Sequence, residues 1–172
     1  MAKRSAGLLL YRKEPSGLLE VLLVHPGGPF WMKRDDQAWS IPKGEYEGGD
    51  EPIETAEREF AEELGHKAPE GDRLDLGELK QTSGKRIRVW AVAGDFDVTR
   101  TKSNSFEMQW PPGSGMMQSF PEIDRAAWFP VMTARNKLSI GQVPFLDRLT
   151  ELLRHVDNLD FFEGNDSSTG AE

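Results

Sequence analysis

One segment, GEYEGGDEPIETAEREFAEELGH at residues 44 to 66, constrains the fold of this chain most, because it specifies a helix with two distinct sides. Acidic residues and Pro52 stand at its start, where the helix dipole and the unpaired N–H groups favour them. Gly65 suits the left-handed position that commonly ends a helix. Between them, apolar residues recur at steps of three and four, as on a helix packed against a sheet. This apolar stripe consists of Ile53, Ala56, Phe60 and Leu64.

Three glutamates lie beside the apolar stripe. Glu59, Glu62 and Glu63 are spaced so that a helix stacks their carboxylates along one side. Carboxylates this close repel each other unless water screens them or a cation lies among them. The pattern alone therefore has two interpretations, a solvated acidic helix face or a site for a divalent metal ion.

The composition limits the kind of protein this can be. A chain of 172 residues fits one domain with a sizeable core. The net charge of −8 opposes binding to long nucleic acids, whose affinity comes mostly from Lys and Arg on phosphates. The absence of cysteine excludes disulfides, thiolate metal sites and cysteine nucleophiles, and suits a reducing compartment. The apolar run from Ala6 to Tyr11 is too short for a membrane span, so we expect a cytoplasmic protein without membrane contact.

The pattern of the rest of the chain predicts strands separated by connecting segments. We expect a hairpin from residues 5–11 and 19–25, a long loop over 99–120 able to cover a site, and a C-terminal helix over 143–156. The polar end from Phe162 onward is expected to be disordered. This gives one domain over residues 1–160 and a tail over 161–172. Further strands are predicted at 74–82, 86–97 and 126–131.

The spacing of fixed residues around the glutamates resembles the signature of the Nudix hydrolases. That signature has Gly, five residues, Glu, seven residues, and then Arg-Glu-hydrophobic-x-Glu-Glu-x-Gly-hydrophobic. The chain differs from it at Asp50, which replaces the usual Glu, and at His66, which replaces the usual apolar residue. Six fixed identities fall in register: Gly44, Arg58, Glu59, Glu62, Glu63 and Gly65.

The resemblance implies both a fold and a reaction. The expected fold is an α/β/α sandwich, with a mixed sheet between the glutamate-bearing helix and the C-terminal helix. The expected reaction is Mg²⁺-dependent hydrolysis of a diphosphate linkage in a small nucleoside-diphosphate derivative, such as a nucleoside triphosphate or a dinucleoside polyphosphate. Mn²⁺ is an alternative cation. Hard cations on carboxylates suit this chemistry, because they offset the charge that develops on phosphoryl oxygens.

The resemblance also assigns roles to particular residues. The metal ligands would be Glu59, Glu62, Glu63 and the backbone carbonyl of Gly44, and Arg58 would pair with Glu62 or with the acidic helix start. The general base is left open between Glu59 and a glutamate in the later loop. Glu122 has the expected placement there, whereas Glu107 lies further upstream.

Three residues are candidates for binding the substrate: Lys43, Arg88 and Trp110. Arg88 is better explained by alternation on an exposed strand face. Trp110 lies in the long loop and is a better candidate for stacking on a nucleobase than Trp90, which lies in an apolar run and is expected in the core. The three histidines are scattered and are expected at the surface or its boundary.

A second functional hypothesis is a catalytically silent domain that senses a nucleotide or binds a partner. Such domains usually lose the carboxylates of the signature, and this chain retains all three. The isoprenoid diphosphate isomerase branch of the same fold employs a catalytic cysteine, which this chain lacks.

Overall fold

A computed structural model describes residues 3–165 of the chain, with side chains described as far as Val156. Within this part, six strands form one sheet in the order β4-β5-β1-β2-β8, and β3 pairs with the first residues of β1. The pairing of β1 with β5 is parallel and the others are antiparallel, so the sheet is mixed, as predicted. The strands are β1 (Arg4–Lys13), β2 (Leu19–Pro26), β3 (Lys43–Tyr46), β4 (Leu74–Lys80), β5 (Arg86–Ala93) and β8 (Ile123–Pro130).

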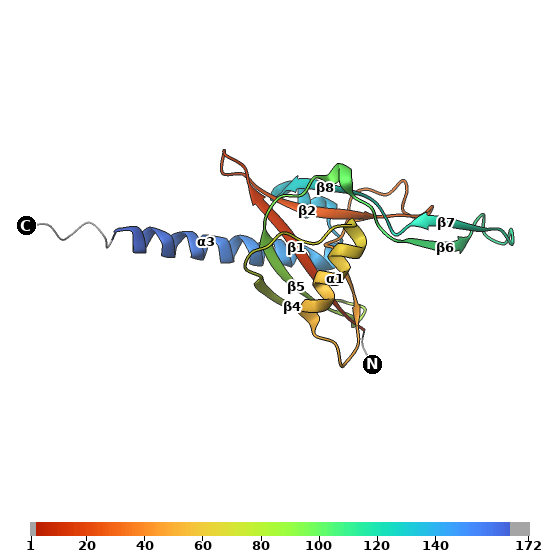
Figure 1. The fold of residues 1–172 in the computed structure, drawn as a ribbon, viewed down its shortest axis with the longest axis horizontal. Coiled ribbons are helices and arrows are strands. Elements are labelled where there is room, and N and C mark those ends of the chain that lie inside the picture. Colours follow the sequence, from red (N-terminus) through yellow and green to blue (C-terminus); the bar gives the residue numbers. More distant parts are fainter. Residues whose placement is uncertain (1–2, 166–172) are drawn as a thin grey trace, which may run out of the picture.

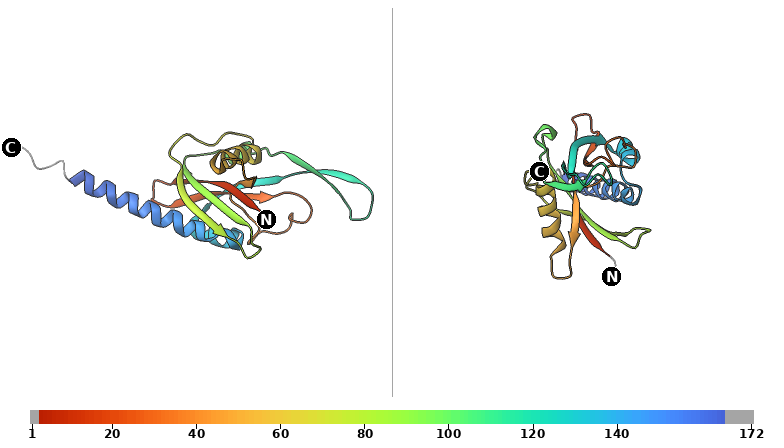
Figure 2. Two further views of the ribbon diagram at one scale, coloured as in Figure 1. Left: turned by 90° about the horizontal axis from the view of Figure 1, so that it is seen from below. Right: turned by 90° about the vertical axis from the view of Figure 1, so that its right-hand side faces the viewer.

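Helices cover both faces of this sheet (Figure 1 and Figure 2). Helix α1 (Pro52–Leu64) lies on one face and α3 (Pro144–Asn165) on the other. A short helix, α2 (Val131–Lys137), follows β8. Two single turns of 3₁₀ helix, at Val98–Arg100 and Ile140–Gln142, complete the helical elements described.

The central strand β1 shows why the sandwich forms. Its side chains alternate between the faces: Leu8 and Leu10 pack on the α1 side, whereas Leu9 packs on the α3 side. All three are fully buried, as expected for a strand covered on both faces. The predicted α/β/α sandwich is therefore confirmed.

The sequence prediction for α1 is also confirmed. Of its apolar stripe, Ala56, Phe60 and Leu64 are fully buried against the sheet. Pro52 occupies the first turn, where a missing N–H is harmless. Gly65 has φ 79° and ends the helix, with its N–H bonded to the carbonyl of Ala61.

The prediction of a long loop over residues 99–120 is wrong. After the 3₁₀ turn at Val98–Arg100, this segment forms a two-stranded hairpin of β6 (Ser105–Gln109) and β7 (Met117–Pro121), which projects beyond the sheet (Figure 1). Polar and turn-forming residues concealed the alternation that places Phe106 opposite Phe120. An isolated hairpin is marginal in water, so its stability depends on contacts with other segments.

Two further boundaries differ from expectation. The strand predicted over 86–97 ends at Ala93, beyond which the chain leaves the sheet toward the 3₁₀ turn. The C-terminal helix continues through Asn165, so the first residues of the predicted disordered tail are helical. The remainder of that tail, 166–172, lies outside the described residues. None of the helices described between residues 3 and 165 has the length and apolar character needed to cross a membrane.

The burial of α1 against the sheet leads to a stability prediction. Replacing Phe60 by Ala removes a fully buried ring and should lower the free energy of unfolding by about 3–5 kcal/mol. Glu54→Ala, on the exposed side of the same helix, should change it by less than about 0.5 kcal/mol. Urea unfolding followed by circular dichroism measures both. Equal effects of the two substitutions would contradict the assignment of the buried face.

Candidate active site on the carboxylate helix

Glu63 is the most unusual ionisable group in the structure. Its side chain points from α1 toward β3, where the backbone N–H of Lys43 donates a hydrogen bond to it. Burial raises the pKa of Glu63 to about 8, the nearby Lys43 cation opposes this rise, and the Glu59 carboxylate adds to it. One of its oxygens, Oε2, is buried without any hydrogen-bond partner. A buried acceptor left unpaired is costly, so this position is prepared for a cationic or proton-donating ligand.

Glu59 lies against the backbone of Gly44 in β3. A Cβ atom added to Gly44 would stand only 2.0 Å from Glu59 Cδ, so no other residue fits there unless Glu59 moves. Burial raises the pKa of Glu59, and the charge of Glu62 raises it further. The fixed glycine and the first glutamate of the signature are thus linked by direct contact.

Two basic residues moderate the negative charge. Lys43 is half-buried, and burial lowers its pKa while the charge of Glu63 raises it. Arg58 is more exposed and lies 3.9 Å from Glu59 and 3.8 Å from Glu62, the latter being the pair predicted from the sequence. Neither Lys43 nor Arg58 forms a hydrogen bond with Oε2 of Glu63, which has no hydrogen-bond partner.

Glu122 joins this group from another part of the chain. It is exposed at the junction of β7 and β8, and its charge raises the pKa values of both Glu59 and Glu63. Its backbone is fixed on both sides: its N–H bonds to the carbonyl of Asn104, and its carbonyl accepts from the N–H of Gly27, each at 2.8 Å. Glu107, the other glutamate considered, lies within β6 and faces Ser119. Of these two, only Glu122 is among the charges that act on Glu59 and Glu63.

The end of α1 is tied to the segment that leads to Glu122. The carbonyl of Leu64 accepts from the N–H of Lys102 at 3.0 Å, and that of Glu62 accepts from the N–H of Asn104 at 3.3 Å. This approach requires Gly65, because a Cβ there would lie 2.5 Å from the carbonyl oxygen of Lys102. The second fixed glycine therefore ends the helix and also admits the segment at Lys102, which leads to the Asn104 carbonyl that binds Glu122.

The remaining predicted residues lie elsewhere. Arg88 is bonded to Asp75 at 2.7 Å and its guanidinium lies over the ring of Trp90, which is in the core as expected. The ion pair raises the pKa of Arg88 and lowers that of Asp75. Trp110 lies on the β6–β7 hairpin, where its ring meets that of Phe30. The structure therefore brings together Gly44, Glu59, Glu62, Glu63, Arg58, Lys43 and Glu122, whereas Arg88 is engaged by Asp75 and Trp110 by Phe30.

One buried polar residue beside the site was not predicted from the sequence. His25 was expected near the surface but is fully buried, with Nδ1 at 2.8 Å from Asp124 and Nε2 at 2.6 Å from the carbonyl oxygen of Arg34. It lies where the β2–β8 register shifts, a β-bulge two residues after Glu122. Its position at the end of an uninterrupted apolar strand was the available signal that it is buried.

The oxygen atoms of this group suit a divalent cation. The available ligands are oxygens, which hard cations prefer, and one buried carboxylate oxygen lacks a partner. Burial is the main cause of the raised pKa values of Glu59 and Glu63, and repulsion from neighbouring carboxylates raises them further. Within the described residues, no three acidic or histidine side chains converge into a complete metal site. The residues fit a cation such as Mg²⁺, which typically completes its coordination with water and substrate phosphates.

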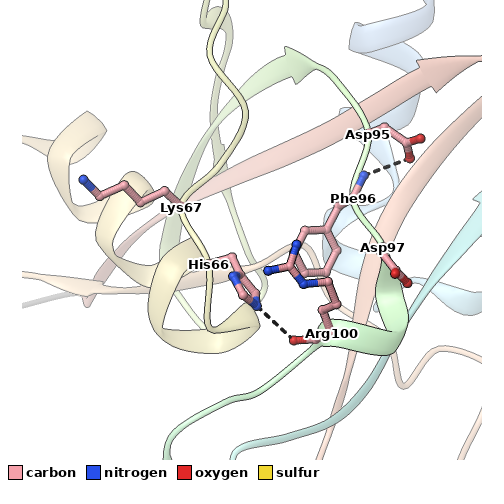
Figure 3. A pocket seen from close by; sticks show the side chains of 6 residues that line it. All are labelled: His66, Lys67, Asp95, Phe96, Asp97 and Arg100. Carbon is pink, nitrogen blue, oxygen red and sulfur yellow. Dashed lines mark hydrogen bonds between the residues drawn. The ribbon is translucent and has the colours of Figure 1, made fainter.

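A surface hollow of about 490 Å³ lies beyond the C-terminal end of α1 (Figure 3). His66 contacts the carbonyl oxygen of Arg100 at 3.2 Å and lies beside the ring of Phe96, 5.9 Å between centroids. Acidic and basic side chains both line this hollow, but none of the signature glutamates does. The lining residues are His66, Lys67, Asp95, Phe96, Asp97 and Arg100.

Comparisons with known proteins identify the family of the chain. The sequence matches the profile of the NUDIX domain over residues 1–149. The 8-oxo-(d)GTP phosphatase of Mycolicibacterium smegmatis is 30% identical over 147 residues, which cover 78% of this chain but only 37% of that protein. The asymmetrical bis(5'-nucleosyl)-tetraphosphatase of Rattus norvegicus is 31% identical over 109 residues, which cover 57% of this chain and 70% of the relative.

Solved structures share the fold at lower sequence identity. The binary complex of the C. elegans Ap4A hydrolase has a TM-score of 0.61 at 20% identity, covering 88% of this chain and 98% of that one. A mutT/nudix family protein from Listeria innocua has a TM-score of 0.59 at 16% identity, covering 91% and 97%. With the profile match extending over most of the chain and the signature residues gathered at one site, the protein belongs to the Nudix hydrolase family.

Proposed function

We propose that this protein is a Mg²⁺- or Mn²⁺-dependent pyrophosphohydrolase, which cleaves a phosphoric anhydride bond in a nucleoside-diphosphate derivative. The observation that carries the proposal is the unpaired, buried oxygen of Glu63, beside Glu59 and within the electrostatic influence of Glu122. A carboxylate is rarely buried without a partner unless a ligand completes its environment. A purely structural role leaves that oxygen unexplained.

The cation would be held by Glu59, Glu62, Glu63 and the backbone carbonyl of Gly44. When bound, it offsets negative charge on the phosphates and makes water a stronger acid. Arg58, which lies between Glu59 and Glu62, orients these two carboxylates. Lys43 adds positive charge beside the buried Glu63.

In the proposed reaction, the oxygen of a water molecule forms a bond to phosphorus while the anhydride P–O bond breaks. The bridging oxygen leaves with the bonding electrons as part of a phosphate product. Glu122 accepts one proton from the water, and the other stays on the second phosphate product. Its exposed side chain on a fixed backbone suits a base that exchanges protons with solvent, whereas Glu59, the alternative base, is engaged by Arg58 and Gly44.

The substrate class is inferred from the relatives. One is named for 8-oxo-(d)GTP and others for bis(5'-nucleosyl) tetraphosphates. Nucleoside triphosphates and dinucleoside polyphosphates are therefore the substrates to test first. A panel of both classes, assayed with product identification in the presence of Mg²⁺ or Mn²⁺, tests the proposal directly. Absence of divalent-dependent hydrolysis across the panel, with nucleotide binding retained, would favour a nucleotide sensor instead.

Replacing Glu63 by Gln should abolish most of the activity. The loss should be at least about 100-fold, because changes to the outer-shell partners of metal ligands already cost 10- to 100-fold. Glu54→Gln, on the exposed side of α1, is the matched control and should retain full turnover. Initial rates of phosphate release at saturating Mg²⁺ measure both. Full turnover in Glu63→Gln would refute the metal assignment.

The buried Glu63 also predicts how stability depends on pH. Its pKa is raised from 4.5 to about 8 on folding, so between these values the folded protein holds a proton that the unfolded chain has released. The free energy of unfolding of the metal-free protein should therefore fall as pH rises through this range, and Glu59 contributes with the same sign.

Glu63→Gln removes the larger of these two contributions and should flatten the pH dependence. Thermal unfolding in EDTA across this pH range measures the effect, with Glu54→Gln as control. Added Mg²⁺ should restore stability to the unsubstituted protein most strongly at the alkaline end, where the carboxylate is free to bind it. A metal-free protein that becomes more stable as pH rises would contradict this account.

The assignment of the base predicts a different outcome at Glu122. Glu122→Gln should lower kcat by about 10²- to 10⁴-fold, the usual contribution of a general base, with little change in Mg²⁺ affinity. Glu59→Gln should weaken Mg²⁺ binding as well as turnover. Steady-state kinetics combined with Mg²⁺ titration distinguishes the two. If Glu59→Gln loses turnover at unchanged Mg²⁺ affinity while Glu122→Gln remains active, the roles are reversed.

A further inference from the structure

The β6–β7 hairpin and the loop over residues 27–34 together form a projection that we call the aromatic arm (Figure 1). It carries five of the nine large hydrophobic side chains found exposed among the described residues. Clustered exposed apolar groups usually mark a binding surface. The five are Phe30, Trp31, Met32, Met116 and Met117.

The two segments of the arm support each other through aromatic contacts. Phe30 meets Trp110 in a T-shaped pair with centroids 5.5 Å apart, and Gly28 approaches the ring of Phe106 closely. In a T-shaped pair, the edge of one ring lies against one face of the other, so each ring keeps at least one face that the pair does not cover. Phe30 is also 59% exposed. Flat aromatic surface therefore remains available for a ligand to stack upon.

The root of the arm is part of the candidate active site. Gly27 starts the loop segment and bonds to the carbonyl of Glu122, which directly follows β7. Asn104, just before β6, bonds to both Glu122 and the last turn of α1 at Glu62. The arm is therefore fixed to the same backbone that positions the carboxylates, and a ligand on the arm can extend toward them.

Charge distinguishes the arm from the rest of the protein. The whole chain carries −8, whereas residues 27–34 and 105–121 contain two cations, Lys33 and Arg34, and one anion, Glu107, for a net charge of +1. Lys33 and Arg34 thus supply positive charge on the arm for an anionic ligand. From the start of β6 to Trp110, the hairpin extends about 17 Å at the usual rise of a strand. A ligand that joins Trp110 to the carboxylates must be long.

We propose that the aromatic arm binds a nucleobase at the far end of the substrate, so that the preferred substrates are dinucleoside polyphosphates. This inference rests on the proposed function, because it places the cleaved anhydride at the carboxylates. Trp110 and Phe30 supply the stacking surface, and Lys33 and Arg34 lie at the end of the loop segment near the phosphate chain. The arm thereby selects substrates that carry a second base.

The first test measures binding without any reaction. AMP and ribose 5-phosphate both lack an anhydride bond and differ in the base, so calorimetric titration with each isolates base recognition. Trp110→Ala should weaken AMP binding about tenfold, as expected for loss of one stacked base, and should leave ribose 5-phosphate unchanged. Trp110→Phe should retain most of the AMP affinity. Met132→Ala, which alters a side chain on α2 that is more exposed than Trp110, is the control and should change neither.

The second test measures kinetics with Ap4A and with ATP. Trp110→Ala and Phe30→Ala should raise KM for Ap4A by about tenfold with little change in kcat, and should affect ATP less. An equal loss for both substrates, or unaltered AMP binding in Trp110→Ala, would overturn the inference. So would arm substitutions that abolish self-association in sedimentation velocity while leaving AMP affinity intact, because the arm would then be an interface between copies of the chain.

The two tests separate this inference from the proposed function. If the protein hydrolyses neither substrate but Trp110→Ala still weakens AMP binding selectively, base recognition by the arm stands and the hydrolase proposal fails. If hydrolysis occurs and depends on Glu63, but the arm variants bind AMP and cleave Ap4A normally, the hydrolase proposal stands and the role of the arm is refuted.

Discussion

The burial of the Glu63 carboxylate between α1 and β3 is the interaction on which the organisation of the site depends. The hydrophobic stripe of α1 holds the helix on the sheet, and this packing forces Glu63 into a position that water reaches poorly. The N–H of Lys43 pairs with part of the carboxylate, but one oxygen is left over. The free energy gained by burying Ala56, Phe60 and Leu64 thus offsets an unfavourable polar burial a few residues away.

Two close approaches explain why the fixed glycines of the signature are needed. Gly44 admits the side chain of Glu59, and Gly65 admits the carbonyl of Lys102. The first contact joins α1 to β3, and the second joins the end of α1 to the segment that leads into the arm. Any side chain at either position would separate α1 from one of these partners. The spacing of the signature is therefore determined by these close backbone contacts as well as by the chemistry of the ligands.

Much of this site was predictable from the sequence because its determinants are local. Glu59, Glu62 and Glu63 share one helix, and their spacing alone places them on one side of it. The proximity of Glu122 to them was suggested only by the family resemblance, because it depends on how β8 pairs with β2 and how the hairpin is attached. The hairpin itself was missed because polar and turn-forming residues hide the alternation of its strands, and because its contacts with residues 27–34 join segments that are far apart in sequence.

The β-bulge at His25 shows how such non-local contacts determine the direction of a side chain. At the bulge, Pro26 pairs with Ile123 while His25 pairs with Arg125, so Asp124 is the extra residue on β8. His25 contacts that residue and also the carbonyl of Arg34, at the end of the loop segment of the arm. One buried ring thus fixes both the strand that follows Glu122 and the loop that supports Trp110. Because bulges redirect the chain beside them, the hydrogen bonds of this ring link the bulged strand after Glu122 to the loop whose Phe30 meets Trp110.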